Sequence, residues 1–411
     1  MSVGATTGDR HAMHAFLREA HWLNAERARA YAAMLVLAFI GMLVATYLKV
    51  PSAGSDFQAF WTAARIMAEH GPAAAFDLDL QREVQTEAGF LEMIAYVNPP
   101  PFLLFVFWLA VLPFGAAWIA WTAVTFGVWF SAMNRAYKGD LTWPLLAFPA
   151  TYLATSHAQN GFLTSALLGG AVLMLRRSPW LSGVLLGMLV IKPHLALLAP
   201  FWLLARGEWR AIAGGALGAA GMILLSLVAF GPASWLAYPE VFEVSRQLMA
   251  QGPSDFWLRM TTPYAGLRYY ASPEVAMAGQ ALITLTLLAL TMIFARRTRD
   301  SMASGAFMLA ATAVASPYLF SYDLPFLVVP VFWLIMDGRA RGWRPYEKLL
   351  VLGLYLSPLA TRVVALPLEI NLMPLPALAM VALIWNRGLT VGERVPTAWY
   401  PTRVGRAAQL A

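Results

Sequence analysis

The sequence contains no cysteine and few charged residues for its length. The absence of cysteine excludes disulfide bonds and thiolate metal sites, and it leaves the redox compartment of the protein open. Charged residues make up 12% of the 411 positions, whereas a soluble domain carries roughly 25%. Hydrophobic residues make up 59% of the chain and the mean hydropathy is +0.60, a combination typical of an integral membrane protein.

Three motifs that would indicate nucleotide or zinc chemistry are also missing. The chain has no GxxxxGK(S/T) phosphate loop, no dinucleotide-binding fingerprint and no HExxH sequence. ATP hydrolysis, nicotinamide chemistry and zinc peptidase chemistry therefore have no support. The six histidines are too scattered for a transition-metal site, so we expect no metal and no cofactor. Two aspartates could still hold a hard divalent cation weakly.

Many apolar blocks are long enough to cross a bilayer, which takes about 20 mostly apolar residues. One such block in a soluble enzyme would indicate a buried helix, but here too little polar sequence separates the blocks. We predict an all-α integral membrane protein, a polytopic helical bundle. The expected spans are 31–49, 162–175, 179–191, 195–205, 210–230, 275–295, 302–315, 324–337, 346–361 and 371–386.

The stretch 99–157 does not fit a simple alternation of spans and loops. It holds apolar blocks at 99–112, 115–133 and 141–155. Three crossings would place one flanking loop on the wrong side of the membrane. We therefore expect one block to be re-entrant, broken or surface-lying, with prolines and glycine supplying the breaks.

Arginine clusters between the apolar blocks predict the orientation, because cytoplasmic loops are enriched in Lys and Arg. The net charge of +7 could suggest nucleic acid, but these short clusters have the pattern of loops, and we expect no nucleic-acid partner. Residues 1–30 are then a cytoplasmic segment, 31–386 a polytopic domain and 387–411 a cytoplasmic tail, in the plasma (inner) membrane. The clusters are Arg176–Arg177, Arg206 with Arg210, Arg296 with Arg297 and Arg299, Arg339 with Arg341 and Arg344, and the tail arginines.

Two outer loops, about 50–98 and 231–274, are long enough to have structure of their own. In the first, apolar residues recur at helical spacing, so we expect an outer-face amphipathic helix that lies in the membrane interface. A second amphipathic stretch follows over about 77–90. The apolar positions of the first helix are Phe57, Phe60, Trp61, Ala64 and Met67.

Asp56 lies just beyond the first span, before this amphipathic helix. A carboxylate there can accept the proton of an attacking hydroxyl. The alternative is an N-cap for the helix over 57–69, a position for which aspartate is well suited. Taken alone the position favours the cap, although both roles are compatible.

Lys192 and His194 flank Pro193 at the outer turn between two short predicted spans. Cations at such a turn could bind a lipid phosphate and stabilise it as a leaving group, with help from Arg259 or Arg268 in the second outer loop. The alternative for Lys192 is a side chain that extends to the interface beside a helix-breaking proline.

A further polar group follows the block 141–155. His157, Gln159 and Asn160 could hydrogen-bond sugar hydroxyls, although the Asn160–Gly161 pair also predicts an ordinary turn between helices. Asp323 could be a second carboxylate of the site or the ion-pair partner of a cation. We favour pairing, and its candidate partners are Lys192, Arg259 and Arg268.

The order and spacing of these pieces resemble the membrane glycosyltransferases of the GT-C fold, and within them glycosyltransferase family 87. The resemblance covers roughly residues 31–340. It departs from the family pattern at Ala158, where a glycine often precedes the glutamine, and at Phe60–Trp61, where tyrosine is common. The matching pieces are Asp56–Phe57, Phe60–Trp61, Gly71, Phe76–Asp77, Tyr96, Asn98–Pro99–Pro100, Gln159–Asn160–Gly161, Lys192–Pro193, Ser316–Pro317 and Tyr322–Asp323.

This resemblance implies transfer of a sugar, typically mannose, from a polyprenyl-phosphate carrier to an outer-face acceptor with inversion. Asp56 would correspond to the catalytic aspartate, and the expected partners are membrane lipid, the polyprenyl-phosphate sugar and a glycan or lipid acceptor. The main alternative is a lipid or solute transporter or flippase. Transporters usually gather polar groups near the bilayer midplane, often with inverted repeats, whereas here these groups lie at the outer helix ends. An assembly subunit without chemistry is the third hypothesis.

Overall fold

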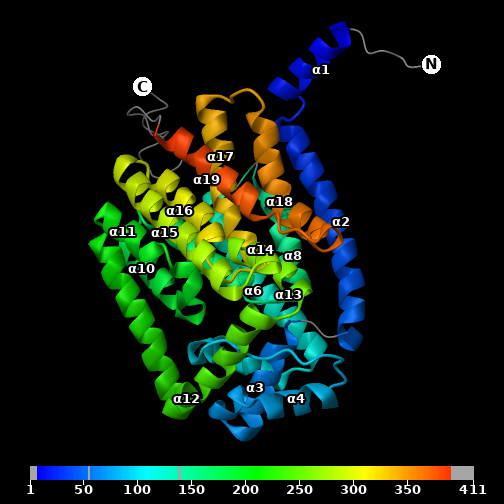
Figure 1. Ribbon diagram of the computed structural model, residues 1–411, viewed down its shortest axis with the longest axis vertical. Coiled ribbons are helices and arrows are strands. Elements are labelled where there is room, and N and C mark those ends of the chain that lie inside the picture. Colours follow the sequence, from blue (N-terminus) through cyan, green and yellow to red (C-terminus); the bar gives the residue numbers. More distant parts are fainter. Residues whose placement is uncertain (1–6, 54–55, 138, 140, 390–411) are drawn as a thin grey trace, which may run out of the picture.

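The computed structural model describes residues 7–53, 56–137, 139 and 141–389. Within these ranges the backbone forms α-helices, short 3-10 turns and one isolated bridge between Met260 and Phe320, so the predicted all-α class is confirmed (Figure 1). Most of the predicted tail, 387–411, lies outside the described residues, as do residues 1–6. The first described element is the helix α1 (Thr7–Glu19).

Six helical segments among the described residues are long and apolar enough to cross a membrane, and four shorter apolar segments accompany them. A bilayer offers no partner to free backbone groups, which is why a chain this apolar folds into helices. The protein is thus a polytopic helical membrane protein. The long segments are α2 (Ala25–Ala53), α6 (Phe114–Tyr137), α12 (Trp209–Gln251), α15 (Pro273–Arg297), Ser321–Arg341 with α17 (Val328–Arg341), and α18 (Glu347–Leu368); the short ones are Pro100–Val111, α9 (Gly161–Met174), Pro179–Ile191 with α10 (Pro179–Gly187), and α16 (Ser301–Ala315).

Two predicted segments differ from the structure. The expected span 195–205 holds α11 (Ala199–Arg206), whose eight residues extend only about 12 Å, because Pro193 begins a 3-10 turn just before it. The expected loop 231–274 begins instead with helix, since α12 bends at Gly231 (φ 74°) and continues to Gln251. Figure 1 shows this bend as an elbow at the end of the molecule that also carries α3. Two short helices follow, α13 (Ser254–Arg259) and α14 (Pro263–Tyr270).

The structure breaks two of the three apolar blocks in the stretch 99–157, where the sequence predicts one. The middle of this stretch forms the full-length α6, whereas 141–155 splits into α7 (Thr142–Leu146) and α8 (Pro149–His157). Pro149 occupies the first turn of α8, where its missing N–H costs no helical hydrogen bond. Pro100–Val111 is a chain of 3-10 and α turns that includes α5 (Leu103–Val106).

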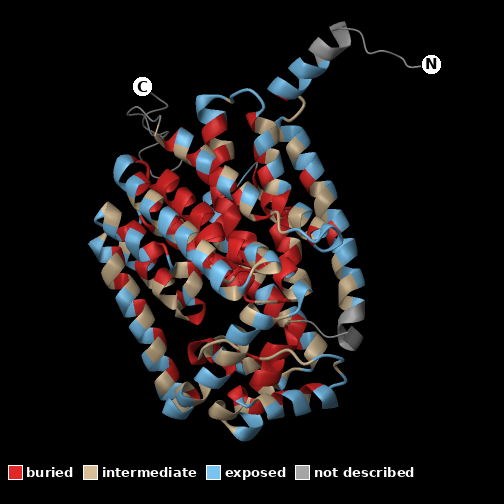
Figure 2. Cartoon of the chain, viewed as in Figure 1, coloured by how far each residue is buried: buried red, intermediate tan, exposed pale blue. Residues whose placement is uncertain are grey.

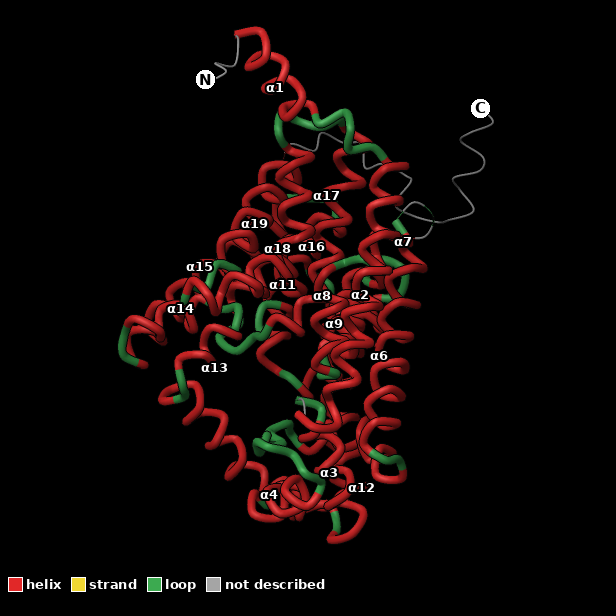
Figure 3. The backbone as a smooth tube through the Cα atoms, turned by 90° about the vertical axis from the view of Figure 1, so that its right-hand side faces the viewer, coloured by secondary structure: helices red, strands yellow, loops and turns green. Residues whose placement is uncertain are grey.

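The first predicted loop folds into α3 (Gln58–His70) and α4 (Leu78–Glu87), joined by a 3-10 turn. The predicted apolar stripe of α3 faces inward, with Phe57, Phe60 and Ala64 almost fully buried. Both helices lie at the opposite end of the molecule from α1 and from the turn between α17 and α18 (Figure 3). We call these the α3 end and the Arg-rich end.

The interior of the bundle has two features, which are close helix contacts at small residues and a fully buried central helix, α16. A Cβ on Gly183 of α10 would lie 1.9 Å from the carbonyl oxygen of Ala211, so α10 and α12 meet backbone to backbone. Every residue of α16 is buried, and Figure 2 shows the buried residues concentrated in the centre of the bundle. Helix α2, by contrast, is mostly exposed along its length.

Buried ion pairs hold the Arg-rich end together. Arg387 of α19 (Pro374–Leu389) contacts Asp337 at 2.5 Å and also Glu347, while Arg341 pairs with Asp337 at 2.5 Å. Each buried charge in this group therefore has an opposite partner. The network joins α17, α18 and α19 where the predicted cluster of Arg339, Arg341 and Arg344 lies.

Candidate active site

Asp56 faces His157, which ends α8. Oδ2 of Asp56 lies 3.3 Å from Nδ1 of His157, and about 30% of each side chain is exposed (30% and 31%). The N-cap of α3 is Phe57, and no side-chain oxygen of a residue that the structure describes caps the helix. The N-cap role considered for Asp56 is therefore wrong, since its carboxylate points to His157 instead. A partly exposed carboxylate of this kind can accept a hydrogen bond from a substrate hydroxyl group.

The turn that carries His157 is built around two unusual backbone positions. Ala158 ends α8 with φ 47° and ψ 34°, the left-handed conformation that favours glycine. Three residues later, a Cβ on Gly161 would lie 1.9 Å from the carbonyl oxygen of Tyr322. Glycine at position 161 thus lets the start of α9 touch the 3-10 turn Ser321–Leu327 directly.

Lys192 joins this turn to Asp323. Its Nζ donates hydrogen bonds to Asn160 Oδ1 at 3.1 Å and to Asp323 Oδ1 at 2.5 Å. The lysine side chain is 7% exposed and that of Asp323 is fully buried, so the pair lies inside the protein. The pairing expected for Asp323 is present, and its partner is Lys192. Asn160 precedes α9 but makes no side-chain cap, because its oxygen accepts from the lysine.

Asp323 also shapes its own turn. Its Oδ2 accepts a hydrogen bond from the backbone N–H of Phe320 at 3.1 Å. The adjacent Tyr322 ring lies between His157 and Lys192. The centroid of the Tyr322 ring is 5.3 Å from the centroid of the His157 ring and 5.4 Å from Lys192 Nζ. Asp56, His157, Tyr322, Lys192 and Asp323 thus form one continuous group.

A cationic side of the site comes from Arg259 and Arg362. Arg259 ends α13 and pairs with Asp255 at 2.7 Å. The next residue, Met260, bridges to Phe320 and so brings α13 beside Tyr322. Arg362 of α18 lies within electrostatic range of both Asp56 and Arg259.

Arg362 is the site residue that sequence reasoning missed. The predicted span 346–361 ends just before it. The sequence did contain a sign of its role, because Arg362 is the one charged residue in the second half of α18. A charge in a membrane helix is costly unless it pairs with another group or serves function. Arg362 forms no ion pair with any residue that the structure describes.

The other predicted residues have different surroundings. The guanidinium of Arg268 donates to the carbonyl oxygens of Ala250 and Ala271 and lies 4.3 Å from the centroid of the Trp257 ring. It therefore ties α14 to the end of α12. Gln159 is half-buried, and its Oε1 accepts from the N–H of Asn160.

His194 sits in the 3-10 turn Pro193–Ala196, beside Tyr318 at 5.5 Å between ring centroids. Burial, and then the nearby charge of Lys192, lower the pKa of His194 to about 3. The imidazole is neutral at ordinary pH and can offer a hydrogen bond but no positive charge. Its Nε2 is buried and has no hydrogen-bond partner among the described residues.

Metal ligands do not gather in the part of the chain that the structure describes: no three His, Asp or Glu side chains come together there. The polar groups of the site are instead arranged as one partly exposed carboxylate, one buried ion pair and two arginines. This arrangement can accept a proton at Asp56 and stabilise an anion beside Arg362.

The sequence model of glycosyltransferase family 87 matches residues 96–317, more than half of the chain. The chain belongs to glycosyltransferase family 87. No curated protein and no solved structure matches it. The family 87 match includes Gln159, Asn160 and Lys192, whereas Asp56 precedes it and Asp323 follows it.

Membership of family 87 makes this chain a membrane glycosyltransferase, as the motif order suggested. This membership favours the transferase hypothesis over the transporter or flippase hypothesis. A glycosyltransferase has a sugar donor and an acceptor as its substrates.

Proposed function

We propose that this family 87 enzyme moves a hexose, mannose by family likeness, from a polyprenyl-phosphate carrier to a glycan or lipid acceptor with inversion. The observation that carries the proposal is the pair formed by Asp56 and His157. In this pair, the Asp56 carboxylate is accessible to a substrate. The Asp323 carboxylate, by contrast, is fully buried and neutralised by Lys192. A general base must reach the acceptor hydroxyl, so Asp56 is the candidate.

The reaction proceeds in one displacement. The acceptor oxygen attacks C1 of the sugar from the face opposite the phosphate, and its proton passes to Asp56. The bond between C1 and the phosphate oxygen breaks, and its electron pair stays on the departing polyprenyl phosphate. Attack from the opposite face inverts C1. His157 holds Asp56 in position for this proton transfer.

The leaving phosphate needs positive charge nearby. Arg362 suits this role best, because it lies near Asp56 and forms no ion pair with a described residue. Arg259, its neighbour, is half-exposed and shared with Asp255. Lys192 and His194 act more weakly in this proposal, since the lysine charge is balanced by Asp323 and the histidine is neutral. Arg268 contributes by fixing the loop that carries Arg259.

The sugar rings lie along the turn between α8 and α9. Gln159 and His157 offer half-buried polar groups there, and Asn160 is held in place by Lys192. Asp323 orients the sugars indirectly, through that lysine and Tyr322. The donor arrives activated by its phosphate, so the reaction requires no cofactor.

We also propose an orientation. The Arg-rich end faces the cytoplasm, following the excess of arginine there, and the site opens to the outer face of the plasma (inner) membrane. A lipid-linked donor fits this arrangement, since its lipid carrier lies in the membrane beside the site.

A donor panel tests the proposal. Purified full-length protein is incubated with polyprenyl-phosphate mannose, polyprenyl-phosphate glucose and GDP-mannose, each with acceptor lipid extracts, with and without EDTA. We expect a product only from a polyprenyl-phosphate sugar, with inverted C1 by NMR and without an effect of EDTA. Turnover with GDP-mannose alone, or product with retained configuration, would overturn it.

A further inference from the structure

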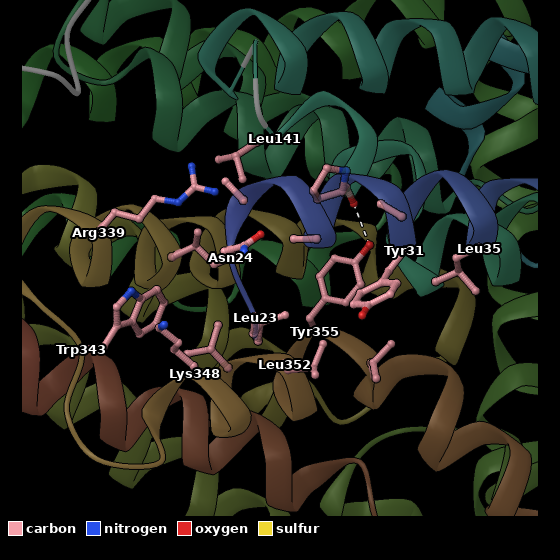
Figure 4. A pocket seen from close by; sticks show the side chains of 17 residues that line it. Leu23, Asn24, Tyr31, Leu35, Leu141, Arg339, Trp343, Lys348, Leu352 and Tyr355 are labelled. Carbon is pink, nitrogen blue, oxygen red and sulfur yellow. Dashed lines mark hydrogen bonds between the residues drawn. The ribbon is translucent and has the colours of Figure 1, made fainter. Parts of the chain in front are cut away.

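An apolar groove of about 400 Å³ lies between α10, α11 and α12. It extends from Leu203 of α11 to Pro193, in the 3-10 turn before that helix. A larger cavity, of about 490 Å³, lies at the Arg-rich end, where Figure 4 shows Arg339 and Lys348 in its lining. The groove differs from that cavity in its uniformly apolar lining and in its position beside the candidate active site.

The lining of the groove consists of apolar residues, and most of them are alanine, glycine or proline. On α12, Ala211, Gly215 and Ala219 recur every four residues, so they share one face of the helix. This face extends over about 12 Å, since an α-helix rises about 1.5 Å per residue. A channel of this kind can hold an apolar chain, but its side chains offer no hydrogen bond to a polar headgroup.

The groove opens on the surface of the bundle. Pro200 of α11 and Ala216 of α12 line it and are exposed. This part of α12 belongs to the candidate membrane span Trp209–Gln251, so the opening faces lipid. On the inner side α10 and α12 are in backbone contact, because a Cβ on Gly187 would lie 2.2 Å from the carbonyl oxygen of Gly215. A chain can therefore enter from the bilayer without separating the helices.

One short turn connects this groove with the candidate active site. Pro193 lines the groove, whereas its two neighbours contact the residues of the site. Lys192 donates to Asp323 at 2.5 Å, and the His194 ring centroid lies 5.5 Å from that of Tyr318. The turn thus has an apolar surface on one side and polar groups on the other. A lipid-linked sugar has the same division, with an apolar chain joined to a phosphate and a sugar.

From this continuity we propose that the groove binds the isoprene units nearest the phosphate of the donor. The proposal rests on the proposed function, which supplies the polyprenyl-phosphate carrier. The chain enters beside Pro193 and runs along α12 toward the Arg-rich end, while the phosphate remains with the cations of the site. A membrane acyl chain has similar chemistry, but only the chain of the donor is attached to a group that the site holds.

His194 lies where the chain meets the phosphate in this arrangement. Its Nε2 is buried and has no hydrogen-bond partner among the described residues. A buried polar atom normally has such a partner, and an oxygen of the donor phosphate would supply it. The turn that holds Lys192, Pro193 and His194 would then contact both parts of the donor.

Photo-crosslinking of the full-length wild type in detergent tests the groove directly. One probe is polyprenyl phosphate with a diazirine in the isoprene units nearest the phosphate, and the other is phosphatidylcholine with a diazirine in an acyl chain. We expect the first probe to label residues 211–219 of α12, unmodified polyprenyl phosphate to suppress this label, and the second probe to label the segment only weakly. Equal labelling by both probes would mean a general lipid groove, and labelling only outside 211–219 would place the chain elsewhere. Either result overturns the proposal.

The chain length of the donor gives a second test. Ala216→Phe fills the groove from its exposed side and should lower kcat/KM for polyprenyl-phosphate mannose about tenfold. The value for isopentenyl-phosphate mannose should not change, because a single isoprene unit does not extend along the groove. Ala220→Phe, exposed on the same helix outside the groove, is the matched control and should behave like the wild type.

Two results of this second test would overturn the groove site alone. They are an equal loss with both donors and no loss with either donor in Ala216→Phe. A wild type that uses no polyprenyl-phosphate sugar would instead overturn the proposed function, and the groove site with it.

Discussion

The carboxylate of Asp56 and the imidazole of His157 lie 3.3 Å apart, although one follows α2 and the other ends α8. The contact orients a carboxylate that still has 30% of its surface exposed. Nearby, the buried Lys192 and Asp323 neutralise each other. Two acidic groups therefore have separate roles, one available to a substrate and one fixed in the framework.

Replacing Asp56 with asparagine should remove the general base while keeping its size. We expect transfer to fall by about two to four orders of magnitude, while binding of the donor lipid stays within a factor of two or so of the wild type. Turnover is measured with purified enzyme, and binding by native mass spectrometry. Asp79→Asn, an exposed aspartate on α4, is the matched control and should keep full activity. Normal turnover in Asp56→Asn would refute the assignment.

His157→Ala tests whether the histidine positions Asp56. We expect kcat to fall about 10- to 100-fold, because a misplaced catalytic group loses rate, with little change in the KM for the donor. His157→Gln should recover part of the loss by keeping a hydrogen-bond donor. The exposed His70, replaced with alanine, serves as the control. A change confined to KM would instead indicate a role in substrate binding.

Arg362→Gln removes the proposed phosphate ligand. Hydrogen bonds to charged groups contribute about 1.5–3 kcal/mol, so the KM for the polyprenyl-phosphate sugar should rise roughly tenfold or more. The KM for the acceptor should not move. Arg299→Gln, at the Arg-rich end, is expected to behave like the wild type. An unchanged kcat/KM for the donor in Arg362→Gln would exclude this arginine from the donor site.

Lys192→Met leaves the Asp323 carboxylate buried without its cation. Such a loss costs about 3–5 kcal/mol, and the thermal unfolding temperature should drop strongly. The double variant Lys192→Met/Asp323→Asn removes both charges and should be more stable than the single variant. Arg82→Gln, which breaks an exposed pair with Asp79, should have no measurable effect. A double variant less stable than the single one would argue against charge pairing as the cause.

Gly161→Ala should disrupt the contact between α9 and the Tyr322 turn. Its Cβ would meet the Tyr322 carbonyl oxygen at 1.9 Å, so we expect a loss of about 1–3 kcal/mol of stability together with a loss of activity. Gly127→Ala in α6 has open space around the new methyl group and should be neutral or stabilising. Ala158→Gly should have the opposite effect to Gly161→Ala, adding about 1 kcal/mol by relieving the left-handed backbone. Both effects are read from thermal unfolding.

The sequence alone determined the class of this protein and the set of residues from which the site is built. A chain this apolar must satisfy its backbone hydrogen bonds within helices. Its few polar residues lie at the ends of predicted helices, on one side of the membrane. The order of Asp56, Gln159–Asn160, Lys192 and Asp323 was enough to suggest the family. The prolines of the stretch 99–157 predicted an irregular block there, although not which one.

Only the tertiary structure decided which of these residues meet. Asp323 had three possible cations, and the choice of Lys192, 131 positions away, depends on how the α9 and Ser321–Leu327 segments pack. The bend at Gly231 and the approach of Arg362 to Asp56 likewise depend on contacts between distant segments. Local sequence sets helix formation and polarity, but side chains find their partners only when helices far apart in the chain pack together.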